Sequence, residues 1–228
     1  MRELPILFSG PMVRAILEGR KTQTRRVVKL PHNNQLGAWE PTTAGGGSVK
    51  YAGGTPAPEL AAIWHTRTGD CYVCPHGDVG DRLWVRETHE VRRIGTETFE
   101  GARPTRRYAG IAYQADDGRT EVDIDLDTFQ ALDAKESRGW TPSINMPRWA
   151  SRITLEITGV RVERLQEISQ DDAEAEGIDF LRSVPDADET LDARGLFHCL
   201  WDGINAERGH GWDANPWVWV VEFRKVES

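Results

Sequence analysis

Apolar and polar residues alternate most clearly between residues 151 and 165. Apolar side chains occupy every second position up to Ile157, and Gly159 then interrupts the run. Val160 and Val162 resume it with the phase shifted. Alternation with a period of two predicts a β-strand with one buried face. A glycine at the change of phase predicts a bulge or a tight bend.

Shorter segments with strand character follow the same reasoning. A final strand is predicted at 217–223, where Trp217, Trp219, Val221 and Phe223 would share one face. Further strands are predicted at residues 5–8, 82–88 and 106–115, with a strand edge at 27–30.

Apolar residues at helical spacing predict helices at 11–18 and about 191–207, and end signals predict a third, short helix at 170–176. Ser169 stands three residues before Asp172 in the manner of a capping box, and Gly177 supplies a stop. Strands interrupted by two or three helices predict an α+β fold built around a small β-barrel.

Two stretches lack such a pattern. Residues 31–69 are rich in Gly, Pro, Thr and Ala, and residues 116–139 are acidic and weakly patterned. Long segments of this kind are typical of functional loops or insertions. We therefore expect a single domain over residues 1–228, with insertions at about 31–74 and 116–139.

Composition narrows the classes of function. The chain is 39% hydrophobic and 28% charged, which is typical of a soluble globular protein. No apolar run approaches the ~20 residues that cross a bilayer, and the N-terminal apolar segment is too short for a signal peptide, so we expect a cytoplasmic protein. A net charge of -8 argues against a basic, whole-surface nucleic-acid binder.

One part of the chain departs from this acidic balance. Six Lys or Arg residues and one acid, Glu18, lie between Arg14 and Lys29. An acidic body with one basic segment favours a focused anionic ligand over long, non-specific duplex contacts.

The cysteines raise the question of a metal. The three are Cys71, Cys74 and Cys199, an odd number that argues against a disulfide framework. Cys71 and Cys74 lie near His65 and His76, which invites a zinc interpretation. A structural zinc site usually has two tight ligand pairs, and a second Cys pair is missing, so thiols in a turn are the favoured alternative. We expect no metal and no cofactor.

The chemistry of the chain is concentrated between Gly19 and Arg26, in the sequence Gly-Arg-Lys-Thr-Gln-Thr-Arg-Arg. We expect this segment to be a loop after a helix that Gly19 ends. A lysine near a hydroxyl can act on an acyl group if the lysine takes up the hydroxyl proton. The same amine and guanidiniums can equally bind phosphate.

This segment resembles the ASCH family of the PUA-like superfamily, in particular the versions encoded by phages and prophages. Its residues fit the family pattern G-x-K-x-x-T-x-R, and the likeness extends to residues 80–87, 146–152 and the closing strand with Trp217 and Trp219. The resemblance implies a PUA-like β-barrel with flanking helices and a cleft for nucleic acid or a nucleoside.

The small N4-acetylcytidine amidohydrolases of this family use a lysine, a threonine and a glutamate. The resemblance implies that Lys21 and Thr24 take the first two roles here. Matching the short helix after the long strand gives the third role to Glu176, with Glu174 two residues away. Thr24 would attack the acyl carbon, Lys21 would accept its proton, and Glu176 would orient or protonate the leaving amine.

Further residues are candidates for binding. Guanidiniums bind phosphate in bidentate fashion, and exposed tryptophans stack on bases. The alternatives are a solvated charged face for the arginines and core or cleft walls for the tryptophans. Glu87 is a second acid, for which a paired structural role is favoured. The binding candidates are Arg20, Arg25, Arg26, Arg148, Trp149 and Trp84.

Three functions remain open. The first is an amidohydrolase that removes an acyl group from the exocyclic amine of a modified cytidine or related nucleoside. The second is a non-catalytic PUA-like module that binds RNA. The third is a ribonuclease, for which the sequence has no dedicated His pair or metal cluster. The expected partner is a modified nucleoside or RNA.

Overall fold

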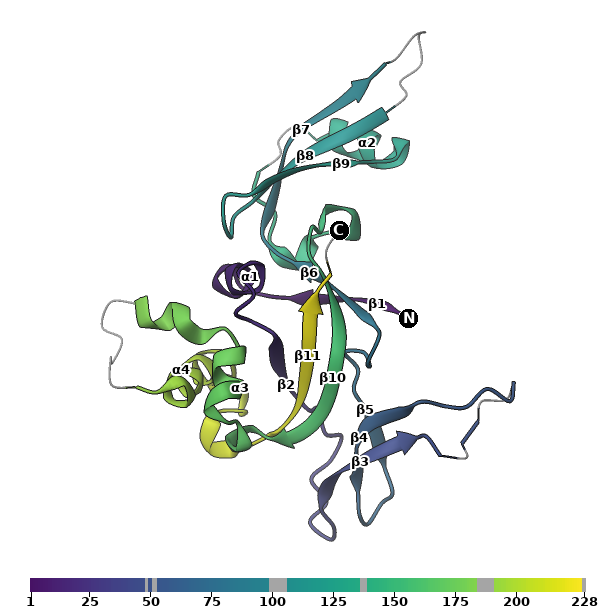
Figure 1. Ribbon diagram of the computed structural model, residues 1–228, viewed down its shortest axis with the longest axis vertical. Helices are drawn as coiled ribbons and strands as arrows, with labels where there is room; N and C mark the ends of the chain where they lie inside the picture. The colour runs from purple at the N-terminus through teal and green to yellow at the C-terminus, as the bar shows by residue number, and fades with distance from the viewer. Residues whose placement is uncertain (48, 51–52, 99–105, 136–138, 184–190, 227–228) are drawn as a thin grey trace.

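The computed structural model describes residues 1–47, 49–50, 53–98, 106–135, 139–183 and 191–226. In these ranges the chain forms eleven strands, arranged in three sheets, and four α-helices (Figure 1). The prediction of an α+β fold is confirmed. No helix among these residues has both the length and the apolar character needed to cross a membrane.

A five-stranded sheet forms the centre of the molecule. β1 and β6 run parallel, and every other neighbouring pair is antiparallel. The predicted bulge in β10 is confirmed, because the pairing with β11 shifts register between Ile157 and Gly159. In spatial order the strands are β1 (Glu3–Leu7), β6 (Arg82–Arg86), β10 (Thr154–Arg164), β11 (Trp217–Lys225) and β2 (Gln23–Val27).

β11 is buried on both faces. Trp219, Val221 and Phe223 belong to one apolar cluster, together with residues of β1, β6 and α1 (Gly10–Leu17). Val218 and Val220 belong to a second cluster on the opposite face. β11 therefore joins the two halves of the core. Each buried Val or Phe side chain of this strand stabilises the fold by about 1.5–3 kcal/mol.

Two helices cover the second face of the sheet, at the lower left of Figure 1. They are α3 (Gln170–Ala175) and α4 (Ala193–Asn205), and both lie in the connection from β10 to β11. The predicted cap of α3 is confirmed, because the Asp172 backbone N–H donates to Ser169 Oγ at 3.0 Å. Phe197 and Trp201 of α4 are buried in the second cluster.

A second sheet forms an arm at the lower right of Figure 1. It contains β3 (Trp39–Gly45), β4 (Glu59–His65) and β5 (Cys71–Val73), all antiparallel. Of the two alternatives for residues 31–69, a long loop or an insertion, the loop is wrong, because two strands lie in this segment. Glycine- and proline-rich turns obscured two short strands that alternate only weakly.

A third sheet lies at the top of Figure 1, with its own helix. It contains β7 (His89–Glu97), β8 (Arg106–Tyr113) and β9 (Arg119–Asp123), followed by α2 (Leu126–Asp133). The weakly patterned segment 116–139, predicted to be an insertion, thus contributes a strand and a helix.

The central sheet is open among the described residues. β1 and β2 are its edge strands, and neither pairs with a further strand. The Arg26 side chain reaches from one edge to the other, where Nη2 donates to Leu7 O at 3.0 Å. A closed PUA-like barrel therefore stays a prediction.

Candidate functional site

The turn after α1 places Lys21 in the interior. Gly19 adopts a positive φ of 76°, which ends the helix without a side-chain clash. The backbone N–H groups of Arg20 and Lys21 both donate to Ala15 O. The predicted loop ends earlier than expected, because β2 begins at Gln23 and includes Thr24, Arg25 and Arg26.

Lys21 is 2% exposed, and its ammonium group uses all three hydrogens. Nζ donates to Gln23 O at 2.8 Å, to Glu176 O at 2.9 Å and to Glu176 Oε2 at 2.8 Å. The predicted contact between Lys21 and Glu176 is therefore present. Because Gln23 precedes Thr24, the same bonds hold the amine beside the Thr24 backbone.

Burial lowers the pKa of Lys21, since the charged amine is removed from water. The positive charges of Arg26 and Arg25 act in the same direction. The Glu176 carboxylate opposes them by Coulomb attraction and by its hydrogen bond. Lys21 is thus easier to deprotonate than a lysine in water.

Glu176 follows the last turn of α3 and is 4% exposed. Its Oε1 accepts from Arg25 Nη1 at 3.2 Å, while Oε2 accepts from Lys21. Glu174 is exposed to solvent. Of these two acids, Glu176 is therefore the one that meets the lysine.

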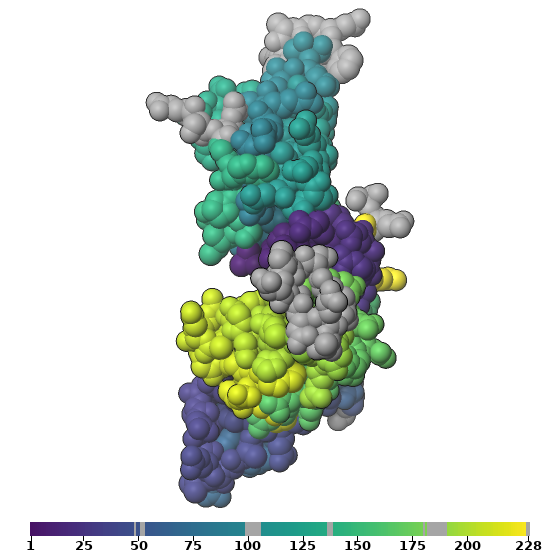
Figure 2. All heavy atoms as spheres, turned by 90° about the vertical axis from the view of Figure 1, so that its left-hand side faces the viewer, coloured from purple at the N-terminus to yellow at the C-terminus, as the bar shows by residue number. Residues whose placement is uncertain are grey.

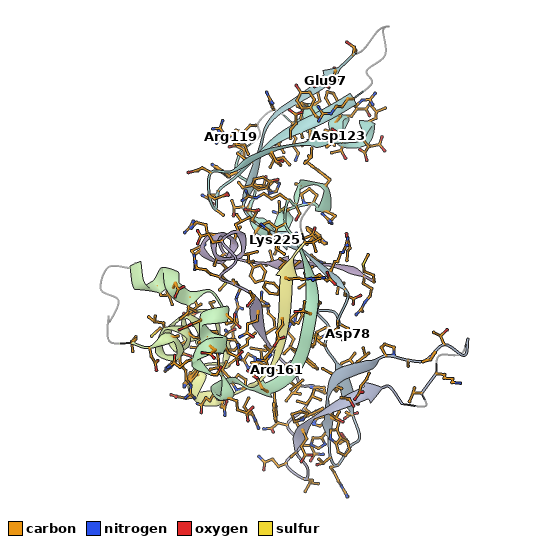
Figure 3. All side chains as sticks on the ribbon, in the orientation of Figure 1. Asp78, Glu97, Arg119, Asp123, Arg161 and Lys225 are labelled. Atoms are coloured by element: carbon orange, nitrogen blue, oxygen red, sulfur yellow. The ribbon has the colours of Figure 1, made fainter. Side chains whose placement is uncertain are left out.

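An ion-pair network surrounds Glu176. Arg25 Nη2 lies 2.5 Å from Glu163 Oε1 and 3.3 Å from Asp172 Oδ2. Arg161, labelled in Figure 3, contacts the same two acids from β10, at 3.0 Å and 3.1 Å. Buried charges are stable only when compensated in this way, so the network fixes the Glu176 carboxylate.

Thr24 is 1% exposed and pairs with Val221 of β11 through the backbone. Within the part of the chain that the structure describes, its hydroxyl has no hydrogen-bond partner. The side chain lines a pocket that Glu176 also lines. A hydroxyl free of protein partners is available to a ligand.

The pocket has a volume of about 790 Å³ and lies between the two edge strands of the central sheet. α1 and α4 form its other walls, and they face the same side of the molecule in Figure 2. The lining residues from α4 and its C-terminal end are Phe197, Leu200, Trp201, Ile204, Asn205 and Arg208. Apolar walls with a few convergent polar groups are typical of small-molecule sites.

Several predicted binding residues lie outside this pocket. Arg20 Nε donates to Glu18 at 2.8 Å, and Arg148 Nε donates to Glu3 at 3.0 Å. Trp149 packs against the apolar clusters of the third sheet.

Two further candidates also have structural partners. The Trp84 ring lies 5.6 Å from the Arg86 guanidinium. Glu87 is 2% exposed and accepts two hydrogen bonds from Arg152, at 2.9 and 3.0 Å, as the favoured structural role requires.

Three further pocket residues were not among the predicted site residues: Arg86, Arg208 and His76, which was considered only as a zinc ligand. His76 follows β5 and reaches the pocket from the arm. Its pKa falls to about 4 because of burial and the positive charges of Arg26 and Lys29. His76 is therefore neutral near pH 7.

The four residues of the zinc interpretation do not form a cluster. Among the described residues no three His, Cys, Asp or Glu side chains are grouped to hold a metal ion. His65 Nε2 lies 3.1 Å from Asn34 O, and His76 lines the pocket. Cys71 is exposed, whereas burial raises the pKa of Cys74 to about 11.

Comparison with family models, curated proteins and solved structures found no match to this chain. The likeness to the ASCH family therefore depends on the motifs of the sequence alone. The geometry of the site is a buried lysine that is hydrogen-bonded to a glutamate, and a threonine that lines the same pocket as that glutamate.

Proposed function

We propose that this protein is an amidohydrolase of the ASCH type, with a PUA-like fold, that removes an acyl group from the exocyclic amine of a modified cytidine or related nucleoside. The observation that carries the proposal is the buried contact between Lys21 Nζ and Glu176 Oε2, with Thr24 and Glu176 lining the same pocket. These three groups supply a base, an acid and a nucleophile.

The lowered pKa of Lys21 supports the proton transfers. In the proposed cycle one proton first moves from Lys21 Nζ to Glu176 Oε2 along their hydrogen bond, which provides a neutral amine and a carboxylic acid. In that form Thr24 Oγ attacks the acyl carbon and its proton moves to Lys21. The C–N bond then breaks as Glu176 gives its proton to the leaving amine, which leaves an acyl ester on Thr24.

Water completes the cycle. It attacks the ester carbon and gives a proton to the Glu176 carboxylate, and the carboxylic acid departs as Lys21 returns its proton to Thr24. Lys21 and Glu176 regain their starting protonation, so the net reaction consumes one water for each amide bond.

The RNA-binding module receives less support. Such a module needs guanidiniums that are free to contact phosphates along a strand. Arg20 and Arg148 are paired with neighbouring acids outside the pocket, and Arg25 is occupied by three acids. Trp149 is packed against the third sheet rather than presented to a base.

The test is release of acetate from N4-acetylcytidine by purified protein. We expect Thr24→Ala and Glu176→Gln each to lower kcat/KM by at least about a hundredfold. The matched control is Thr22→Ala, because Thr22 is an exposed hydroxyl in the same turn. Circular dichroism and thermal unfolding check that each variant is folded.

Two outcomes would contradict the proposal. Wild-type activity of the Thr24→Ala variant would show that Thr24 is not the nucleophile. If the protein releases no acid from any acylated nucleoside yet binds RNA with an affinity that falls steeply with salt, the module is the correct function.

A further inference from the structure

The pocket contains more positive charge than the proposed reaction uses. Among the described residues that line it, Glu176 is the one acid, and Lys21 and Arg25 already neutralise that carboxylate. Arg26, Arg86 and Arg208 also line the pocket. Within the described residues none of these three guanidiniums contacts a carboxylate.

Arg86 is the strongest indication of a missing ligand. It ends β6, opposite Leu7 of the edge strand β1. Its Nε is buried and has no hydrogen-bond partner among the described residues. Its guanidinium lies 5.6 Å from the Trp84 ring. This contact does not use the N–H donors, which lie in the plane of the guanidinium. Buried N–H groups in folded proteins are almost always paired, so this donor requires an acceptor from outside the chain.

Arg26 also has donors to spare. Nη1 donates to Arg25 O at 3.3 Å and Nη2 to Leu7 O at 3.0 Å. A guanidinium has five N–H groups, and these two bonds fix its plane while leaving three free. Arg208, which follows α4, is exposed and adds a third cation to the pocket wall.

The remaining polar residue of the wall is compatible with an anion. His76 carries no charge near pH 7, in part because Arg26 and Lys29 make its surroundings positive. The same field that keeps His76 neutral attracts a negatively charged ligand.

We infer that the substrate is a phosphate ester of the nucleoside, and that Arg26, Arg86 and Arg208 bind its phosphate. Fixed guanidiniums match the oxygen geometry of phosphate, and three of them balance a dianion better than they would a neutral nucleoside. This inference rests on the proposed function, because it assigns the substrate class of the same pocket. The inference predicts that the substrate is a nucleotide and not the free nucleoside.

Binding can be measured without any catalysis. Calorimetric titration of the wild-type protein with CMP and with cytidine gives the ratio of their affinities. We expect CMP to bind at least about tenfold more tightly, with a ratio that falls as salt rises. Arg86→Gln and Arg208→Gln should each reduce that ratio. Because Arg208 is exposed, its variant is expected to fold even if Arg86→Gln does not.

The control is Arg224→Gln, on an exposed arginine that is paired with Glu156; it should keep the wild-type ratio. Equal affinities of the wild-type protein for CMP and cytidine would overturn the inference, as would an unchanged ratio in both pocket variants. The dinucleotide CpC serves as a further ligand: tighter binding than CMP identifies a phosphodiester in RNA as the source, and weaker binding identifies a free nucleotide.

The two proposals can fail separately. If CMP binds preferentially but acylated cytidine and its 5′-phosphate are both left intact, the phosphate site stands and the hydrolase does not. If acetate is released equally well from both compounds, the hydrolase stands and the phosphate site does not.

Discussion

At the residue scale, the site is a set of mutually compensating charges. Lys21 and Arg25 face Glu176, and the other acids around Arg25 are shared with Arg161. Removing one partner leaves an uncompensated buried charge, which typically costs about 3–5 kcal/mol. Substitution of Thr24, which belongs to no ion pair, therefore tests the chemistry more cleanly than substitution of Lys21.

His76 provides a prediction about acid stability. Its pKa is about 4 in the folded protein and 6.5 in the reference state, so the unfolded chain binds more protons between these values. The contribution of His76 to stability is complete above pH 6.5 and is lost as the pH falls to 4. Between pH 7 and pH 4 we expect the free energy of unfolding of the His76→Asn variant to fall by about 2–3 kcal/mol less than that of the wild-type protein.

Urea unfolding at pH 7, 5.5 and 4 measures this difference. The variant and the wild-type protein share all other titrating groups, so those contributions cancel in the comparison. Parallel losses of stability in the two proteins would show that His76 is not desolvated in the pocket wall.

The residues of the site differ in how far the sequence revealed them. Lys21, Thr24 and Glu176 were accessible because a motif and a capped helix marked them. Arg25 was expected to bind ligand, but it is held by acids that lie 138 or more residues away in sequence. No binding role was predicted for Arg86 or Arg208, and His76 was considered only as a zinc ligand, since what joins the three is a shared cavity wall.

At the element scale, the ends of two helices meet at the site. Gly19 follows α1 and Gly177 follows α3, with φ of 76° and 74°. A Cβ on Gly177 would lie 2.8 Å from both Lys21 Cβ and Ala15 Cβ, whereas one on Gly19 would meet nothing within 4 Å. The two glycines share one backbone conformation but only Gly177 has close neighbours.

This difference predicts unequal costs of substitution. Gly19→Ala should lower the free energy of unfolding by about 1 kcal/mol, the penalty of a left-handed conformation. Gly177→Ala should cost about 1–3 kcal/mol more, because the added methyl pushes α3 away from Lys21. Urea unfolding of both variants provides the measurement, and equal losses would contradict the close packing of α3 on Lys21.

The predictability of the elements follows their burial. β10 and β11 were visible because one or both of their faces are apolar. β2 was expected to be a loop, since its buried side chains include Gln23, Thr24 and Arg25. Their burial depends on ion pairs from distant segments, which no local pattern can reveal. In β9 and β5 the exposed side chains dominate, so the apolar signal is weak.

At the scale of the whole molecule, one ion-pair cluster joins the central sheet to the third sheet. Arg152 precedes β10 and contacts Glu87 after β6 and Asp116 after β8, at 2.9 Å and 2.6 Å. Its guanidinium also lies 4.0 Å from the Tyr113 ring. Burial raises the pKa of Glu87 despite the hydrogen bonds from Arg152.

Arg152→Met should therefore destabilise the protein by about 3–5 kcal/mol, because it leaves Glu87 charged and buried. The loss in free energy of unfolding should be smaller for the double variant Glu87→Gln/Arg152→Met than the sum of the losses for the two single variants. Urea unfolding of the three variants measures this coupling. Arg148→Met, in an exposed pair with Glu3, is the control and should change little. Additive losses in the double variant would mean that the cluster does not act as a unit.

The open edge of the central sheet has a consequence for synthesis of the chain. β2 carries Thr24, and its one strand partner among the described residues is β11, which begins at Trp217. On the ribosome β2 therefore emerges early, and its one strand partner among the described residues follows only after nearly two hundred further residues have been made. In nascent chains shorter than that, β2 lacks the strand that holds it in the pocket wall, so we expect the pocket to assemble only when translation reaches the final strand.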